Sequence, residues 1–410
     1  MTHFDFDRSF EAPFELVPVE PGEGVVAEAY RSRLFVLTVH DGDVIPRRFR
    51  EHADGSPIVP LDTLERAHVR ERDWGANLVA HELARALGLP CYGRVRIARV
   101  LLDFNRFPGS TPPATRDPLE RLSINPPFTE ALSHPQKMDL LDVYDRISDA
   151  METCFRDKLI VLCIHTYDER NPSATSRPHL SLVNIPAGYQ RDARMPHNVF
   201  DPIYPDVLAE STCSRILRDR ISLNLERKGF RVSSNHPYAL PEGSIEVRAQ
   251  VWYFFTYLRR RFEAAHPHAA DDEAHHIVWE MLLNTNLRKA LPEALWGHLH
   301  RYQRAAPEHE GLFGRAAAAY AEIRRFIGEA NVPRDFRRNP ERPSNLALEV
   351  RKDLLCELDP QGIPRPATPK LQQRAQVIAR VIAGAMNTYL EQDRKLQEPT
   401  DGAFLGDGAK

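Results

Sequence analysis

The stretch FVLTVHDGDVIP, residues 35–46, joins an apolar run to a cluster of polar side chains. Residues 35–39 are rich in apolar, β-branched and aromatic side chains, which predicts a buried strand. His40, Asp41 and Asp43 follow at once, and Gly42 lets the chain turn tightly away. In open α/β sheets, ligands bind beyond the carboxyl ends of the strands, so this end of the strand is a candidate site.

Strand-like and helix-like segments alternate along the first 250 residues. Further strand-like runs occupy residues 93–106, 158–168, 177–186 and 243–251, and helix-like runs occupy 61–88, 135–157 and 214–230. Such alternation is typical of an α/β protein in which helices cover both faces of one sheet. We therefore expect a three-layer αβα sandwich with a mostly parallel or mixed central sheet.

After about residue 249 the sequence becomes helical in character. Residues 251–266, 271–291, 314–330 and 370–397 all have helical patterns, and a loop rich in proline and arginine spans 331–344. We predict an α/β domain over residues 1–265 and a C-terminal helical extension over 266–410 that could pack on that domain. These helices could also serve as a surface for a protein partner or for self-association.

The composition argues against several classes of partner. The formal net charge is only -3, so no strong global field attracts the chain to nucleic acid. No apolar run approaches the roughly 18 residues of a membrane span, and no signal peptide is visible at the N-terminus. The five cysteines are scattered and include no Cys-x-x-Cys pair, which disfavours a disulfide framework. A reduced, cytoplasmic setting fits these features best.

Metal-binding side chains stand at the expected strand ends. His40 and His165 lie at the ends of two buried strands, and Glu71 and Asp73 lie in the helical run between the first two strands. Two histidines and one carboxylate form a common catalytic zinc set with an open fourth position. The helical phase places Glu71 and Asp73 on nearly opposite faces, and it does not choose between them.

Three further residues suit hydrolysis of an amide beside a free carboxylate. Glu246, in a strand-like run, could take a proton from an activated water and pass it to the leaving nitrogen. Arg106 could bind the carboxylate through two parallel hydrogen bonds, and Asn105 could add another donor.

The ordered motifs VHDG, RDWGANL, LLDFNRFP, VLCIHTYD and SIEVR, between residues 31 and 250, resemble the N-formylglutamate amidohydrolase family, within the zinc carboxypeptidase-like and aspartoacylase-like group. The resemblance implies a zinc-carboxypeptidase-like fold with one zinc per chain, held by His40, Asp73 and His165, with Glu71 as the reserve ligand. It also implies Glu246 as general base and acid. The chain departs from the family pattern at Asp41, directly after the first histidine.

The resemblance further makes Asn105 and Arg106 the residues that bind the substrate carboxylate, and it places Tyr238 in a loop over the site. The expected activity is zinc-dependent hydrolysis of an N-acyl amino acid, N-formyl-like, with a free carboxylate. One alternative is a peptide-directed metallo-carboxypeptidase or tailoring hydrolase of the same fold. Another is a non-catalytic scaffold that binds through its helical tail.

Overall fold

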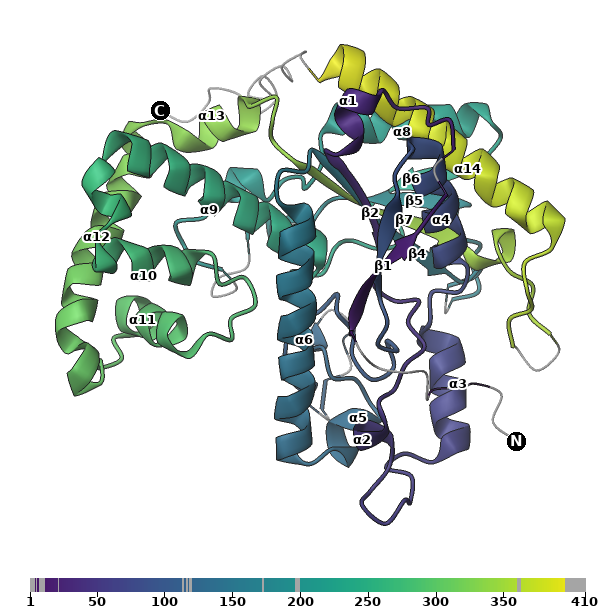
Figure 1. The fold of residues 1–410 in the computed structure, drawn as a ribbon, viewed down its shortest axis with the longest axis horizontal. Helices are drawn as coiled ribbons and strands as arrows, with labels where there is room; N and C mark the ends of the chain where they lie inside the picture. The colour runs from purple at the N-terminus through teal and green to yellow at the C-terminus, as the bar shows by residue number, and fades with distance from the viewer. Residues whose placement is uncertain are drawn as a thin grey trace.

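A computed structural model describes residues 4, 6, 12–20, 22–112, 114, 115, 117, 120–171, 173–195, 200–359 and 363–394. Its centre is a seven-stranded sheet in the order β1-β3-β2-β4-β7-β5-β6 (Figure 1). The strands are β1 Phe14–Pro18, β2 Leu34–Thr38, β3 Cys91–Val95, β4 Ile160–Tyr167, β5 Leu180–Val183, β6 Val232–Ser234 and β7 Ser344–Arg351. The pairs β2/β3, β2/β4, β4/β7 and β5/β6 are parallel, whereas β1/β3 and β5/β7 are antiparallel. The predicted mostly parallel, mixed sheet is confirmed.

Helices account for most of the remaining chain. The α-helices are α1 Glu28–Arg31, α2 Arg47–Arg50, α3 Leu61–Glu71, α4 Ala76–Leu87, α5 Phe128–Ala131, α6 His134–Phe155, α7 Ala187–Asp192, α8 Arg215–Arg227, α9 Ile245–Ala265, α10 Glu273–Leu282, α11 Ala290–Arg301, α12 Glu310–Glu329, α13 Val332–Arg338 and α14 Pro369–Thr388. Short 3-10 turns are η2 Asp206–Leu208, η3 Pro267–Ala270, η4 Pro307–His309 and η5 Lys352–Leu354, and the π-helical turn η6 spans Tyr389–Asp393. Among the described residues, no helix is both long and apolar enough to cross a bilayer.

Two hydrophobic cores lie on opposite faces of the sheet. Successive strand residues point to opposite faces, so Leu162 and Ile164 of β4 join one core while Val161 and Cys163 join the other. The first core contains the buried faces of α4, α8 and α14, and the second contains those of α6 and α9. Figure 1 shows α4, α8 and α14 together beside the sheet. The predicted three-layer sandwich is therefore present.

The C-terminal part of the chain contributes a central strand that the sequence analysis missed. β7 lies between β4 and β5, and its pattern SNLALEVR alternates apolar Leu346, Leu348 and Val350 with other residues. Residues 266–410 therefore supply β7 and the sheet-covering helix α14 in addition to a helical lobe. That lobe comprises α10 to α13, which gather with α9 on the left of Figure 1.

Three local predictions differ from the structure. The single helix predicted for residues 61–88 is two helices, α3 and α4, separated at residues 72–75. The strand predicted for 93–106 ends at Val95 and continues as irregular chain. The strand predicted for 243–251 is the start of α9, because the Ser244 hydroxyl caps the helix by accepting a hydrogen bond from the Val247 amide.

Candidate metal centre and its cavity

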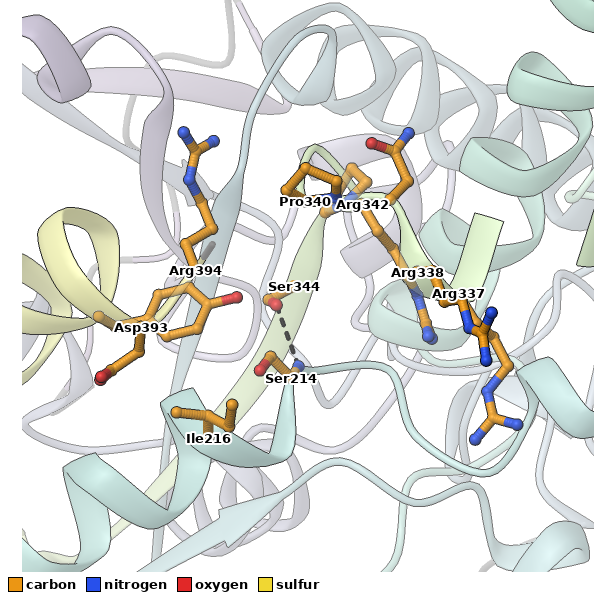
Figure 2. A pocket seen from close by; sticks show the side chains of 12 residues that line it. Ser214, Ile216, Arg337, Arg338, Pro340, Arg342, Ser344, Asp393 and Arg394 are labelled. Atoms are coloured by element: carbon orange, nitrogen blue, oxygen red, sulfur yellow. Dashed lines mark hydrogen bonds between the residues drawn. The ribbon is translucent and has the colours of Figure 1, made fainter. Parts of the chain in front are cut away.

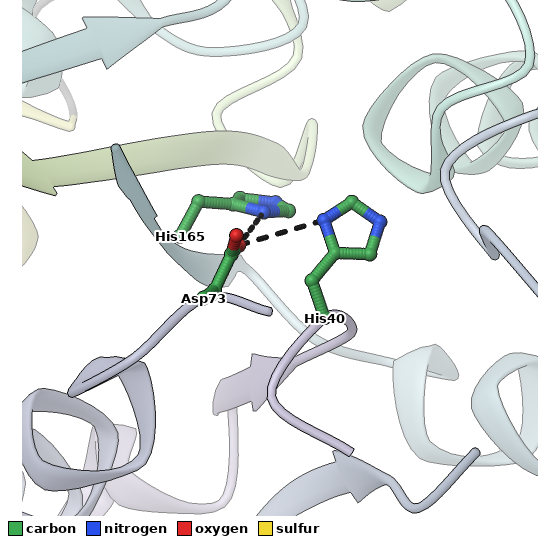
Figure 3. A group of neighbouring side chains, drawn as sticks. All are labelled: His40, Asp73 and His165. Carbon is green, nitrogen blue, oxygen red and sulfur yellow. Dashed lines mark hydrogen bonds and ion pairs between the residues drawn. The ribbon is translucent and has the colours of Figure 1, made fainter. Parts of the chain in front are cut away.

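Three predicted ligands meet at the carboxyl ends of the central strands β2 and β4, although they come from distant parts of the chain (Figure 3). His40 follows β2, His165 lies in β4, and Asp73 lies between α3 and α4. The Oδ2 atom of Asp73 is 3.0 Å from Nδ1 of His165 and 3.5 Å from Nδ1 of His40. All three side chains are buried, and their candidate ligand atoms lie within 4.8 Å of one another.

Both histidines face this centre with their Nδ1 atom. Nε2 of His40 bonds to Oδ1 of Asp103 at 2.8 Å, while its Nδ1 is buried and has no hydrogen-bond partner among the described residues. A carboxylate behind a histidine fixes the ring and its tautomer, and leaves the opposite nitrogen free to bind a metal. Two imidazole nitrogens and one carboxylate oxygen form a donor set that suits zinc. The residues present therefore fit a metal of this kind.

Asp73 is placed by a break in the helical run. Its backbone amide donates to the carbonyl of His40 at 3.0 Å, which ties the break to the end of β2. Gly75, with φ of 87°, reverses the chain there, and α4 begins at Ala76. The carboxylate of Glu71 instead pairs with Arg70 at 3.1 Å, outside the group formed by Asp73 and the two histidines.

Arg99 links the two acids of the centre. Its Nη1 lies 3.4 Å from Oδ1 of Asp73, and its Nε lies 3.2 Å from Oδ2 of Asp103. Burial alone would raise the pKa of Asp73, but the contacts with His165 and His40 and the charge of Arg99 lower it overall. Burial is likewise outweighed at Asp103, where Arg99 and His40 hold the pKa well below its usual range. Both carboxylates are therefore ionised at neutral pH.

His165 has acceptors on both ring nitrogens. Its Nε2 lies 3.1 Å from Sγ of Cys163 and 3.8 Å from Oε1 of Glu246. Burial would lower the pKa of His165, but Cys163, Asp73 and Glu246 raise it well above its usual range. The negative charge of Asp73 beside Nδ1 also favours a metal cation at that position.

Glu246 lies behind His165. It belongs to the first turn of α9, it is 2% exposed, and neither carboxylate oxygen has a hydrogen-bond partner among the described residues. It is not one of the residues that line the adjoining cavity. The sequence placed Glu246 correctly beside the centre but in a strand that does not exist.

Glu349 is the residue that the sequence reasoning did not identify. It lies in β7 directly opposite His165 in the parallel register, and it lines the cavity. Burial raises the pKa of Glu349, in opposition to the nearby His165. The alternating pattern of residues 344–351 was the available signal, but it falls in a region whose other segments are helical.

The centre opens into a cavity of about 390 Å³. The three residues predicted to bind substrate, Asn105, Arg106 and Tyr238, all line it. Oδ1 of Asn105 accepts from the Ile245 amide at 3.0 Å, so this side chain also fixes the start of α9. The Arg106 guanidinium donates from Nη1 to the Asn105 carbonyl at 3.0 Å, and it has no carboxylate at ion-pair distance among the described residues. Burial lowers the pKa of Arg106.

A second arginine, Arg248, holds the segment that carries Arg106. It is 2% exposed, and it donates to the carbonyls of Gly243 at 3.0 Å and Phe104 at 3.1 Å. It also donates to Oδ1 of Asn286 at 2.7 Å. These bonds connect the segment around Asn105 to the start of α9.

Asp41, where the chain departs from the family pattern, does not face the cavity. It is 1% exposed, and it accepts from the Thr38 hydroxyl at 2.6 Å and from Nε of Arg94 at 3.0 Å. Arg94 belongs to β3, so the pair joins the end of β2 to the neighbouring strand. Its role is therefore structural in this arrangement.

A smaller pocket of about 50 Å³ lies at the start of β7 and α8 (Figure 2). The Ser214 amide there donates to the Ser344 hydroxyl at 3.0 Å. Two of its arginines are paired with acids, Arg337 with Glu210 at 3.0 Å and Arg394 with Glu341 at 2.6 Å. None of the three candidate metal ligands lines this pocket.

No family model matches the chain, and no curated protein matches it. Among solved structures, N-formylglutamate amidohydrolase from Ralstonia eutropha JMP134 is similar, with 15% identity and a TM-score of 0.45 over 91% of this chain and 97% of that one. A gene product of Agrobacterium tumefaciens is similar with 13% identity and a TM-score of 0.42, over 94% of this chain and 100% of that one. Similarity at this level does not identify an activity. Membership of the N-formylglutamate amidohydrolase family stays a prediction from the sequence motifs.

Proposed function

We propose that this protein is a zinc-dependent hydrolase that cleaves the amide bond of an N-acyl amino acid with a free carboxylate. One observation carries the proposal. The buried Nδ1 atoms of His40 and His165 converge with Asp73 at the wall of a cavity that also holds Arg106, a half-buried cation without a carboxylate partner among the described residues.

His40, Asp73 and His165 would hold the metal. When bound, zinc lowers the pKa of a water to about 7 and polarises a substrate carbonyl. Asp103 keeps His40 in the tautomer that presents Nδ1, and Arg99 keeps Asp73 and Asp103 ionised.

We assign the general base to Glu349 instead of Glu246. Glu349 lines the cavity and has a raised pKa, as suits a group that takes a proton from the attacking water and returns it to the leaving nitrogen. Glu246 lies outside the cavity lining, 3.8 Å from Nε2 of His165, and in this proposal it orients that ring.

Arg106 supplies the binding energy for the substrate carboxylate. Its guanidinium is half-buried at the cavity wall, where partial desolvation strengthens a charged hydrogen bond. Tyr238 is 40% exposed at the cavity rim and can close over the bound ligand. Short peptides with a free carboxylate present the same chemical groups, so the alternative peptide substrate belongs to the same test.

The test compares Glu349→Gln and Glu246→Gln in zinc-loaded protein, with Glu152→Gln, a partly buried carboxyl on α6, as the matched control. Substrates are formyl-, acetyl- and peptidyl-amino acids. We expect Glu349→Gln to lower kcat by about 10²- to 10⁴-fold with full zinc content. Glu246→Gln should chiefly weaken zinc affinity.

Two results would contradict these assignments. If Glu246→Gln loses turnover at full zinc occupancy while Glu349→Gln stays active, the general base is Glu246. Wild-type protein that neither binds zinc nor cleaves any amide in the panel would exclude the hydrolase and favour the scaffold alternative.

A further inference from the structure

Three histidines and one glutamate gather where α9 meets the helical lobe. His266 directly follows α9, His268 lies in η3, His275 lies in α10 and Glu322 lies in α12. The ring centre of His268 is 6.0 Å from that of His266 and 5.9 Å from that of His275. None of these four residues lines the cavity beside the candidate metal centre. They therefore form a second cluster of metal-binding side chains, which the proposed hydrolase activity does not use.

The Glu322 carboxylate lies between two of the imidazoles. Its Oε1 is 3.7 Å from Nδ1 of His266, and its Oε2 is 3.4 Å from Nε2 of His275. Neighbouring ligands of a tetrahedral zinc ion are about 3.4 Å apart, because bonds from zinc to nitrogen and oxygen are about 2.0–2.2 Å long. The carboxylate is thus at the distance of a neighbouring ligand from each imidazole.

The cluster is more open than the candidate metal centre, whose ligand atoms all lie within 4.8 Å of one another. A bound ion therefore requires His266 or His268 to turn toward it. Both side chains have room to turn, because His266 is half-buried and His268 is exposed. We accordingly expect the cluster to bind zinc more weakly than the candidate centre does.

His275 is held in the way that a metal-binding histidine is held. It is 6% exposed, and its Nδ1 bonds to Oδ2 of Asp272 at 2.7 Å. Its Nε2, which faces Glu322, is buried and makes no hydrogen bond to any described residue. The bonds from His275 lower the pKa of Asp272, so this carboxylate is ionised. A carboxylate behind a histidine fixes the tautomer and leaves the opposite nitrogen free to bind a metal, as Asp103 does for His40.

We propose that His266, His275 and Glu322 bind a divalent transition-metal ion such as zinc, with His268 as the fourth ligand. Imidazole nitrogens and one carboxylate oxygen form a donor set that suits zinc. Four protein ligands leave no open position, which is typical of a structural ion. The ligands come from the end of α9, from η3, from α10 and from α12, so the ion joins these elements of the lobe.

The experiment uses full-length protein without a histidine tag, stripped of metal and titrated with Zn²⁺ against a chromogenic chelator. We expect wild type to bind two equivalents, of which His275→Gln loses one and His40→Gln loses the other. Asp272→Asn should weaken the lobe site by about 10- to 100-fold, because the amide no longer polarises the His275 ring. His276→Gln, at the exposed neighbouring histidine on α10, is the matched control and should bind two equivalents.

Thermal unfolding gives a second readout that does not depend on activity. An ion that binds only the folded chain stabilises it, so Zn²⁺ should raise the Tm of His40→Gln, which retains only the lobe site. The double variant His40→Gln/His275→Gln should show no such rise. If His275→Gln does not fold, Glu322→Gln, at a half-exposed position, takes its place in both measurements.

The outcomes separate the lobe site from the candidate metal centre. A single equivalent that His40→Gln abolishes and His275→Gln retains overturns the lobe site, while the hydrolase proposal stands. A single equivalent that His275→Gln abolishes and His40→Gln retains supports the lobe site and contradicts the hydrolase proposal. Zinc binding that is the same in wild type and His275→Gln, or no binding by wild type, overturns the lobe site.

Discussion

Nε2 of His40 bonds to Oδ1 of Asp103 at 2.8 Å, and this leaves Nδ1 of His40 turned toward Asp73 and the proposed metal. Asp103 is itself paired with Arg99 at 3.2 Å, so the carboxylate stays ionised and oriented. The relationship orients a histidine at a strand end for the proposed role of metal ligand. It also explains why the segment that carries Arg106 is packed against the end of β2.

Replacement of Asp103 by Asn should weaken zinc binding by about 10- to 100-fold, because the amide no longer polarises the His40 ring. Competition with a chromogenic chelator measures the affinity. A matched control is buried Asp201, which bonds to Nε2 of His300 at 3.0 Å and is not among the residues that line the cavity. Asp201→Asn should leave zinc affinity at the wild-type value. Equal losses in both variants would mean that the effect is a general loss of stability.

Asp41→Asn should destabilise the fold without weakening zinc binding. The carboxylate holds Arg94 of β3 at 3.0 Å, and burial makes this pair expensive to disturb. Because Arg94 retains Glu15 at 3.3 Å, the free energy of unfolding should fall by about 1–3 kcal/mol in urea titrations. A tenfold loss of zinc affinity at unchanged stability would instead place Asp41 in the metal site.

Gly75→Ala should lower both stability and zinc affinity. Gly75 has φ of 87°, and an added Cβ would lie 2.6 Å from Cβ of Leu355, so the break that positions Asp73 must shift. We expect a loss of about 1–3 kcal/mol in the free energy of unfolding. Gly55→Ala is the control, since it has φ of 83° but open space around its Cα. A comparable loss of zinc affinity in both variants would show that zinc binding does not depend on the geometry of the break between α3 and α4.

His68 should make the fold sensitive to mild acid. It is packed between Phe4, Phe6 and Trp74 at ring-centre distances of 5.0, 5.2 and 5.7 Å. Burial, with help from the Arg72 charge, lowers the pKa of His68 to about 3. The unfolded chain then takes up a proton below about pH 6.5 that the folded chain does not, so stability falls as the pH drops toward 3.

Between pH 7 and pH 5 this single group should cost about 2 kcal/mol of folding stability. Urea unfolding of wild type and His68→Phe across that range isolates the effect, because other titrating groups are common to both proteins. The His68→Phe curve should be flatter by that amount. Parallel curves for the two proteins would show that His68 does not titrate differently on folding. His276→Gln, at an exposed histidine on α10, should follow the wild-type curve.

Local sequence predicted the elements whose pattern agrees with their packing. The mostly apolar runs at β2, β4 and β5 are buried along their whole length, as strands covered on both faces are, and α6, α8 and α14 carry apolar stripes. The sequence patterns predicted the wrong element where a segment is compatible with both a strand and a helix. Residues 243–251 are apolar enough for a strand, but Ser244 caps a helix there, and β7 is an alternating run inside a helical region.

The sequence by itself determined the α/β class, the histidines at the strand ends and the Asn105–Arg106 pair, because residue type and strand-end position are local properties. Only the tertiary structure decided that Asp73, and not Glu71, joins the histidines, since that depends on a helix break held by the His40 carbonyl. Only the structure placed Glu349 in the cavity, through the insertion of β7 beside β4, and Glu246 behind His165, through the start of α9 that Asn105 holds. Such placement arises from contacts between residues far apart in the chain, which no local pattern encodes.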